Sequence, residues 1–396
     1  MAVKQQNRKI SIVEGSVRQR QNGTYELRIS TGKMVNGKPQ YKSIYGKTKK
    51  ELKEKARDYN ENQTKFIENV QGTTFQEYAL FWMKTYKLPN LKPVSYDRME
   101  QTYKTACNYL GNVQMGNITS EDVQAMINDL AKEKAYSTVK KHFELVNSVF
   151  KYSVNSRKLG FNPCAAVELP SERNMKVQTK QAEIFTQDET DAMYAFNMKL
   201  KTSRNQFFKH MPAILLMLNT GWRIGELLAL EWKDIDFRER QAVISKTLTK
   251  AKVRDENGEI LSRHKETYAD KTKTKSGERI TPLNDMAIEL LNQIKEYNKR
   301  MKIKSDYVVC TSDGGYVSER NLLRTFNSVM GVIGAEKNYT IHSLRHTYAS
   351  RLLMNGVEIS VVSKLLGHAD INTTYSKYIH VLDSQLNSKM KEFKRI

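Results

Sequence analysis

The sequence predicts a multidomain α+β protein: an N-terminal three-stranded sheet plus a helix, an all-helical middle domain, and a mainly helical C-terminal domain with a small antiparallel sheet. The chain has 396 residues, which is too many for one ordinary hydrophobic core. Near the N-terminus apolar residues alternate with polar ones, whereas from residue 74 to about residue 169 they repeat at helical spacing. The remainder combines long helical patterns with one β-rich stretch, so two or three domains are expected.

The formal net charge of +22 favours a polyanionic partner, with nucleic acid ahead of an anionic membrane surface. No window approaches the roughly 18 consecutive apolar residues that a membrane-spanning helix needs. Residues 1–10 are polar and lack the apolar core of a signal peptide, so a cytoplasmic location is expected. Three widely spaced cysteines indicate buried free thiols and neither a disulfide framework nor a zinc knuckle: Cys107, Cys164 and Cys310.

Residues 1–72 carry 16 Lys and Arg against 7 Asp and Glu, and their pattern predicts the three-stranded sheet. The alternation over residues 25–30 is typical of a strand. Asn22-Gly23 precedes that strand and Asn36-Gly37 follows it, and both are favoured hairpin turns because Asn and Gly tolerate positive φ. A third strand is expected over residues 40–45.

The capping-box pattern from Thr48 to Glu51 predicts that a helix follows this sheet and ends near Asn62. A sheet of three strands is thin enough to enter a DNA major groove. DNA binding is the favoured interpretation of this basic domain, chiefly because of the motifs further along the chain, and the plain alternative is a small basic domain with solvated lysines.

Thr74 and Glu77 form a second capping-box pattern and begin a run of helices that reaches about residue 169. Two apolar stripes at helical spacing are interpreted as core: Val123, Met126, Ile127 and Leu130, then Val139, Phe143, Val146, Val149 and Phe150. Residues 171–181 are polar, with little pattern, and read as a linker. Beyond it, strands are expected at residues 242–248 and 280–283, separated by a long charged excursion.

Three short segments in the C-terminal half carry chemistry: Thr220-Gly221-Trp222-Arg223-Ile224-Gly225-Glu226-Leu227, His342-Ser343-Leu344-Arg345-His346, and Leu366-Gly367-His368 with Thr374, Tyr378 and His380 beyond it. Each motif alone is weak, but all three in this order make a strong signal. Together they resemble the catalytic domain of the tyrosine recombinase, or phage integrase, family, and the whole chain looks most like integrases of Gram-positive conjugative transposons.

The resemblance implies a division of the chain into four parts. Residues 1–72 resemble an arm-type DNA-binding domain and residues 73–172 a core-binding domain. Residues 182–384 resemble the catalytic domain, and residues 385–396 form a C-terminal tail. The segment from about Leu382 to Ile396 could dock on a neighbouring protomer, with a frayed tail as the plain alternative.

Arg223 and Arg345 are predicted to clamp the two non-bridging oxygens of a phosphodiester, because a planar guanidinium donates bidentately and stays protonated. His342 lies three residues before Arg345, so both share one helical face if the segment is helical. Glu226, three residues after Arg223, either orients that arginine or is an ordinary surface charge.

Tyr378 is the predicted nucleophile, since the family places it two residues before a histidine, as in Tyr378-Ile379-His380. Its neighbour Tyr375 falls at a variable position. A tyrosine hydroxyl has a pKa near ~10 and needs help to attack. His342 or His368 is expected to accept its proton or to hydrogen-bond the phosphate.

The leaving 5′-oxygen needs a proton, and the family supplies it from a lysine in a β-hairpin that precedes an arginine and a proline. The run from Lys273 to Pro282 matches this pattern, with Arg279 as its arginine. Lys273 is preferred by its spacing to Pro282. Lys271 and Lys275 remain open, because lysines at alternate positions share one strand face and are easily misregistered.

The resemblance implies a 3′-phosphotyrosine intermediate, a free 5′-hydroxyl and exchange through a four-way junction, with no metal, nucleotide or other cofactor. The implied partners are double-stranded DNA at core and arm sites and three further copies of the chain, forming a homotetramer on two DNA sites. An accessory DNA-bending or excision factor is a further possible partner. No membrane partner is expected.

Three other interpretations were weighed. His342 and His346 have i, i+4 spacing that can bind zinc, but Ser343 stands where the hydrolase motif needs Glu, so His346 is assigned a structural role. A DNA-binding regulator without catalysis is disfavoured because the six-residue set is complete: Arg223, Lys273, His342, Arg345, His368 and Tyr378. A type IB topoisomerase is disfavoured by the arm-like N-terminal domain.

Overall fold

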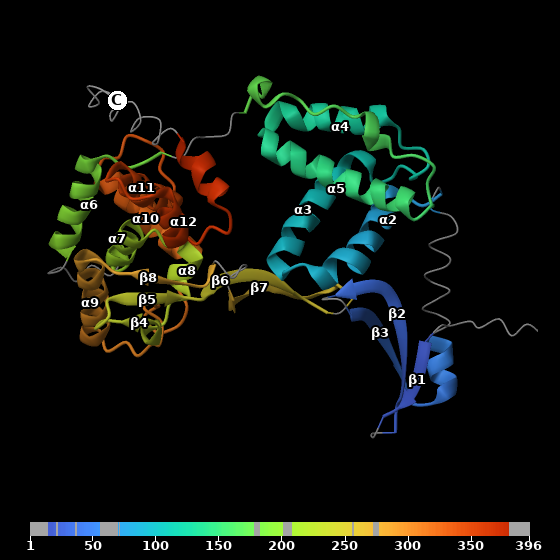
Figure 1. Cartoon of the computed structure of the whole chain (residues 1–396), viewed down its shortest axis with the longest axis horizontal. Coiled ribbons are helices and arrows are strands. Elements are labelled where there is room, and N and C mark those ends of the chain that lie inside the picture. Colours follow the sequence, from blue (N-terminus) through green and yellow to red (C-terminus); the bar gives the residue numbers. More distant parts are fainter. Residues whose placement is uncertain are drawn as a thin grey trace, which may run out of the picture. The chain divides into compact units, whose positions relative to one another are not determined.

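The computed structural model describes residues 15–20, 23–35, 38–55, 70, 72–177, 183–200, 208–255, 257–271 and 277–379. The chain divides into two compact units, residues 1–179 and 180–396 (Figure 1). This division falls within the predicted linker, in which residues Glu172–Asn174 form one 3₁₀ turn. The separation of residues 1–72 from residues 73–172 as domains stays a prediction.

The first unit begins with an antiparallel sheet in the order β1–β2–β3, formed by Gly15–Gln19, Tyr25–Val35 and Lys38–Gly46. This confirms the predicted three-stranded sheet. Gly23 has a φ of 80°, the left-handed conformation expected of an Asn-Gly turn. Its partner Asn22 and the second turn, Asn36-Gly37, lie outside the described residues.

The predicted helix follows the sheet and is described over residues 49–55, so its expected end near Asn62 lies outside the described residues. The Thr48 hydroxyl accepts a hydrogen bond from the backbone N–H of Glu51 at 3.1 Å, as the capping pattern predicts. Leu27 of the sheet and Leu52 of the helix are buried in a small core of their own.

The rest of the first unit is helical, with α2 (Phe75–Trp82), α3 (Pro93–Leu110), α4 (Ser120–Glu133) and α5 (Tyr136–Asn155). The capping box at the start of α2 is present. Both predicted apolar stripes lie in one core, where Phe143 alone of their nine residues is only partly buried. This confirms the helical middle of the chain.

The second unit is mainly helical, as expected: α6 (Gln187–Leu200), α7 (Met211–Thr220), α8 (Ile224–Leu228), α9 (Asp285–Arg300), α10 (Glu319–Val332), α11 (Ile341–Met354), α12 (Ile359–Leu366) and a helical segment at residues 371–379. Its small sheet has the order β4–β5–β8, from Ile235–Asp236, Gln241–Ile244 and Arg279–Pro282. A separate antiparallel hairpin joins β6 (Lys246–Arg254) to β7 (Ile260–Lys271).

One strand prediction was wrong in this unit. The single strand expected at residues 242–248 is two strands, which separate at Ser245 because β5 pairs with β8 whereas β6 pairs with β7. Most of the charged segment between the two predicted strands therefore belongs to the β6–β7 hairpin.

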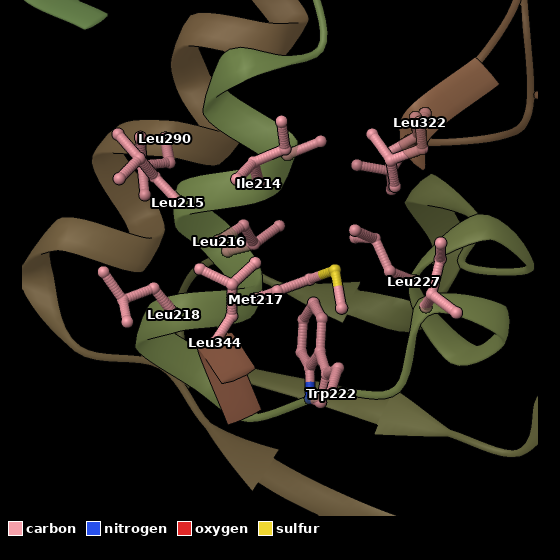
Figure 2. Packing of buried hydrophobic residues seen from close by; sticks show 14 of the residues in the cluster. Ile214, Leu215, Leu216, Met217, Leu218, Trp222, Leu227, Leu290, Leu322 and Leu344 are labelled. Atoms are coloured by element: carbon pink, nitrogen blue, oxygen red, sulfur yellow. The ribbon is translucent and has the colours of Figure 1, made fainter. Parts of the chain in front are cut away.

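The core of the second unit surrounds α7, which is apolar on every side (Figure 2). Ile214, Leu216 and Met217 have no exposed surface, and the Trp222 ring lies next to Met217. Burying each such side chain contributes about 1.5–3 kcal/mol. The residues that follow α7, beginning with Gly221 and Trp222, are therefore anchored by this buried core.

The structure bears on two expectations drawn from composition. All three cysteines are free; Cys164 and Cys310 are buried, and Cys107 is only partly so. Within the described ranges, every helix is too short or too polar to cross a membrane.

Candidate active site

The first motif forms the tight connection from α7 to α8. Gly221 ends α7 with a φ of 65°, and a Cβ there would lie 2.4 Å from Cδ1 of Tyr348. The Trp222 indole N–H donates to the Thr281 hydroxyl of β8 at 3.2 Å. Arg223 follows as the N-cap of α8 with its side chain 39% exposed. The loop therefore presents this arginine to solvent from a fixed backbone.

Glu226 is buried and joins Arg223 to the sheet. Its carboxylate accepts from Nη1 of Arg223 at 2.7 Å and from Nη2 of Arg279 at 2.8 Å. Burial opposes its ionisation, but Arg279 and then Arg223 outweigh that effect and lower the pKa of Glu226 to about 2. The surface-charge alternative for Glu226 is therefore wrong.

Arg279 was noted in the sequence only as part of the lysine pattern, yet it links three segments. From β8, its buried guanidinium bonds Glu226 in α8 and donates through Nε to the carbonyl oxygen of Leu365 at the end of α12, at 2.8 Å. It also donates to the carbonyl oxygen of Gly277 at 3.3 Å. Gly277 lies in the run from Lys273 to Pro282 that matches the lysine pattern.

The second motif lies in the first turns of α11, so His342 and Arg345 share a helix as expected. His342 is exposed, whereas Arg345 is buried. Arg345 donates to the carbonyl oxygens of Gly221 at 2.7 Å and Leu366 at 2.6 Å. These bonds hold the ends of α7 and α12 against α11. Burial, and then the charge of Arg223, lower the pKa of Arg345 to about 9, so it remains cationic at neutral pH.

His368 follows Gly367, which ends α12 in the left-handed conformation. Its Nε2 lies 3.0 Å from Nη2 of Arg345, and its Nδ1 lies 2.7 Å from the Thr374 hydroxyl oxygen. A guanidinium can only donate, so Nε2 accepts and Nδ1 carries the proton, which it donates to Thr374. Burial, followed by the charge of Arg345, lowers the pKa of His368 to about 3.

Tyr378, at the end of the helical segment 371–379, has only 2% of its surface exposed. Its hydroxyl lies 3.0 Å from Nδ1 of His346. The sequence pointed to His342 or His368 as its partner and gave His346 a structural role, but the partner in the structure is His346. Burial raises the pKa of Tyr378 to about 12 and lowers that of His346 to about 4, so both are neutral at neutral pH.

The remaining predicted residues are placed as follows. The rival Tyr375 is 51% exposed on the outer side of its helix. Lys273, Lys275 and His380 lie outside the described residues. Lys271 is described through its backbone only, as the last residue of β7. The lysine assignment therefore stays a prediction.

The site is strongly electropositive. The charges of Arg223, Arg279, Arg345 and Lys377 all act to lower the pKa of His368. The N-terminus of α11, which carries His342, adds the positive end of a helix dipole. In the part of the chain that the structure describes, no group of His, Cys, Asp and Glu side chains could hold a metal ion. An anion with several oxygens, such as a phosphodiester, fits this arrangement.

Comparison with known proteins identifies family models and relatives that match this chain. The profile of the phage integrase family matches residues 183–385, and that of the phage integrase N-terminal SAM-like domain matches residues 74–131. A XerC-like tyrosine recombinase from Caldanaerobacter subterraneus is 29% identical over 384 residues, which cover 91% of this chain and 93% of that protein. The integrase of Staphylococcus phage L54a is 24% identical over 86% of this chain and 98% of that protein.

Solved structures share the fold. The integrase of the Tn1549 transposon in complex with a circular intermediate DNA has a TM-score of 0.64 at 18% identity, over 80% of this chain and 99% of that chain. A λ integrase tetramer bound to a Holliday junction has a TM-score of 0.56 at 17% identity, over 91% and 94%. Since the family profile spans half of its residues, this chain belongs to the phage integrase family of tyrosine recombinases.

Proposed function

We propose that this chain is a site-specific DNA recombinase that integrates and excises a mobile element by cutting and rejoining DNA strands. The observation that carries this proposal is the convergence of Arg223, Arg345 and His368 with Tyr378 in one electropositive site. Similarity to a transposon integrase supports a Gram-positive conjugative transposon as the element.

In the proposed reaction, Arg223 and Arg345 bind the non-bridging oxygens of the scissile phosphate, with His342 and His368 beside them. The Tyr378 oxygen attacks phosphorus and the bond to the 5′-oxygen breaks, which leaves a 3′-phosphotyrosine and a free 5′-hydroxyl. The tyrosine proton leaves to a base or to solvent, and Lys273 protonates the departing 5′-oxygen. Removing one arginine should cost several kcal/mol of transition-state stabilisation.

Because the phosphotyrosine conserves the bond energy, the 5′-hydroxyl of a partner strand can reverse the reaction and join two DNA molecules. Four protomers on two DNA sites, exchanging strands through a four-way junction, suit this chemistry; a λ integrase tetramer on a Holliday junction is a solved example. We assign core DNA to residues 73–172 and 182–384 and arm DNA to residues 1–72. Contact with a neighbouring protomer is assigned to the segment from about Leu382 to Ile396. The substrates lie in the bacterial cytoplasm.

A test uses nicked duplexes that trap a covalent adduct, together with plasmid relaxation and strand joining between two labelled duplexes. A recombinase forms the adduct at a defined site and joins strands between partners. Relaxation of any plasmid without site preference would instead indicate a type IB topoisomerase. Binding without an adduct would indicate a catalytically silent regulator.

A further inference from the structure

The nucleophile-bearing helical segment 371–379 makes two inward hydrogen bonds, one to the predicted catalytic residue His368 and one to His346. Thr374, which is fully buried, accepts from Nδ1–H of His368, and one turn later Tyr378 meets Nδ1 of His346 at 3.0 Å. The Tyr378 ring also lies in a small apolar cluster with Ala349, Leu353, Val362 and Leu366. This face of the segment is therefore closed against α11 and α12.

The closed position is not one from which Tyr378 can react. Attack requires its oxygen to come within about 3–3.5 Å of phosphorus, in line with the leaving group. A phosphodiester on duplex DNA is charged and hydrated, and it cannot enter an apolar cluster in which the tyrosine keeps 2% of its surface. The Tyr378 side chain must therefore leave His346 before it reaches a phosphate held by Arg223, whose side chain is 39% exposed.

Two roles are open to His346: it accepts the tyrosine proton during attack, or it holds the hydroxyl until DNA displaces it. Its environment favours the second. Burial makes His346 a weak base with a pKa of about 4 beside a phenol with a pKa of about 12, so transfer of the proton is strongly uphill. The charge of Lys377 disfavours a cationic imidazole further.

We propose that His346 is a positioning residue which holds the Tyr378 hydroxyl in a closed, unreactive position, so that release of this hydrogen bond limits the rate of DNA cleavage. This inference rests on the proposed function, because it takes Tyr378 as the nucleophile. In this proposal His346, the second histidine of the motif, positions the nucleophile and does not bind the phosphate.

The test compares His346→Leu with His346→Asn in single-turnover cleavage of nicked duplexes at saturating protein. Leucine leaves the buried hydroxyl of Tyr378 without a partner in the closed position, so adduct formation should accelerate by about three- to tenfold at unchanged DNA affinity. Asparagine, whose Oδ1 can replace Nδ1 as acceptor, should restore the wild-type rate. A rate that falls or stays unchanged in His346→Leu contradicts the proposal; a base would lose on the order of 10²–10⁴-fold.

A second measurement does not depend on cleavage. Amide hydrogen exchange of the DNA-free protein should be faster at residues 371–379 in His346→Leu than in wild type or His346→Asn, with exchange in α11 unchanged. Equal exchange in all three proteins contradicts the closed position. If wild type forms no adduct on any duplex, the proposed function fails, whereas the exchange result still decides whether His346 holds Tyr378.

Discussion

Glu226 stands at the centre of the charged residues in the site. It is 3% exposed and pairs with two arginines, one that faces solvent and one that is buried. A buried carboxylate of this kind is costly unless both partners stay in place. Its bond to Nη1 of Arg223 gives that partly exposed arginine one orientation.

Glu226→Gln should lower the free energy of unfolding by about 3–5 kcal/mol, because it leaves buried Arg279 without a counter-charge. Adduct formation should fall as well, since Arg223 loses its orienting carboxylate. Urea denaturation measures the first effect. The matched control is Glu183→Gln, which makes the same change in an exposed pair with Lys337 and should cost under about 1 kcal/mol. Equal losses in both variants would contradict the assignment.

The sequence could predict the residues whose chemistry is visible in their type and spacing. It pointed to Arg223, His342, Arg345, His368 and Tyr378, of which the structure brings Arg345 to His368 directly. It could not predict the contacts that hold them. Arg279 meets Glu226 from 53 positions away and His346 meets Tyr378 from 32, and no local periodicity reports such pairs.

Thr374 shows the same limit. It stood in the third motif without an assigned task, yet its hydroxyl accepts the Nδ1 proton of His368, whose tautomer is fixed by Arg345 on the other ring nitrogen. Its short distance along the chain from His368 was a usable signal, but the turn that brings the two together could not be read from residue types.

At the scale of elements, the turn from α7 to α8 depends on a glycine. Gly221→Ala should lower the free energy of unfolding by about 2–4 kcal/mol, because alanine is strained at a φ of 65° and its Cβ would overlap the Tyr348 ring. Gly160→Ala is the control, since a Cβ there meets nothing within 4 Å. Thermal denaturation of both variants checks this, and a tolerated Gly221→Ala would count against the tight turn.

Capping boxes were reliable predictors of elements, because a local hydrogen bond determines each of them. Of the two predicted Asn-Gly turns, only Gly23 is described, and it has the expected positive φ. The hairpin of β6 and β7 was read only in part. Its strands are highly charged, and among the described residues they pair only with each other, so they lack the alternation of a half-buried strand.

The segment of the sequence between β7 and β8 is expected to supply the general acid from Lys273. Lys273→Ala should slow cleavage of a normal duplex by roughly 10²–10⁴-fold. A duplex with sulfur in place of the 5′-bridging oxygen should restore the rate, because a thiolate leaves without a proton. Lys271→Ala and Lys275→Ala are the controls. Sulfur rescue confined to one of these variants would move the assignment to that lysine.

At the scale of the whole molecule, composition alone predicted a multidomain chain with an anionic partner, since length limits one core and charge attracts phosphate. The two compact units agree with the first prediction. Composition could not show that arginines and a lysine from distant segments surround the histidine of one site, because that depends on the folded arrangement.

Burial of two histidines in the site, followed by the positive charge around them, makes stability depend on pH. His346 and His368 have folded pKa values of about 4 and about 3, below the ordinary value of ~6.5, so the unfolded chain binds more protons below that pH. The free energy of unfolding should therefore fall as pH decreases from 7 to 5, by at most about 1 kcal/mol per pH unit for each partly exposed histidine. Urea denaturation at each pH measures the slope, which His346→Asn should reduce. Stability that is constant or rises on acidification would contradict the neutral histidines.

The identity of the residue that becomes attached to DNA decides the central claim. The direct measurement is to trap the adduct on a nicked duplex, digest the protein and sequence the peptide that carries the DNA end. The expected peptide contains Tyr378 bonded to a 3′-phosphate, and Tyr378→Phe should bind the duplex without forming any adduct. An adduct at exposed Tyr375, or one that persists in Tyr378→Phe, would contradict the mechanism.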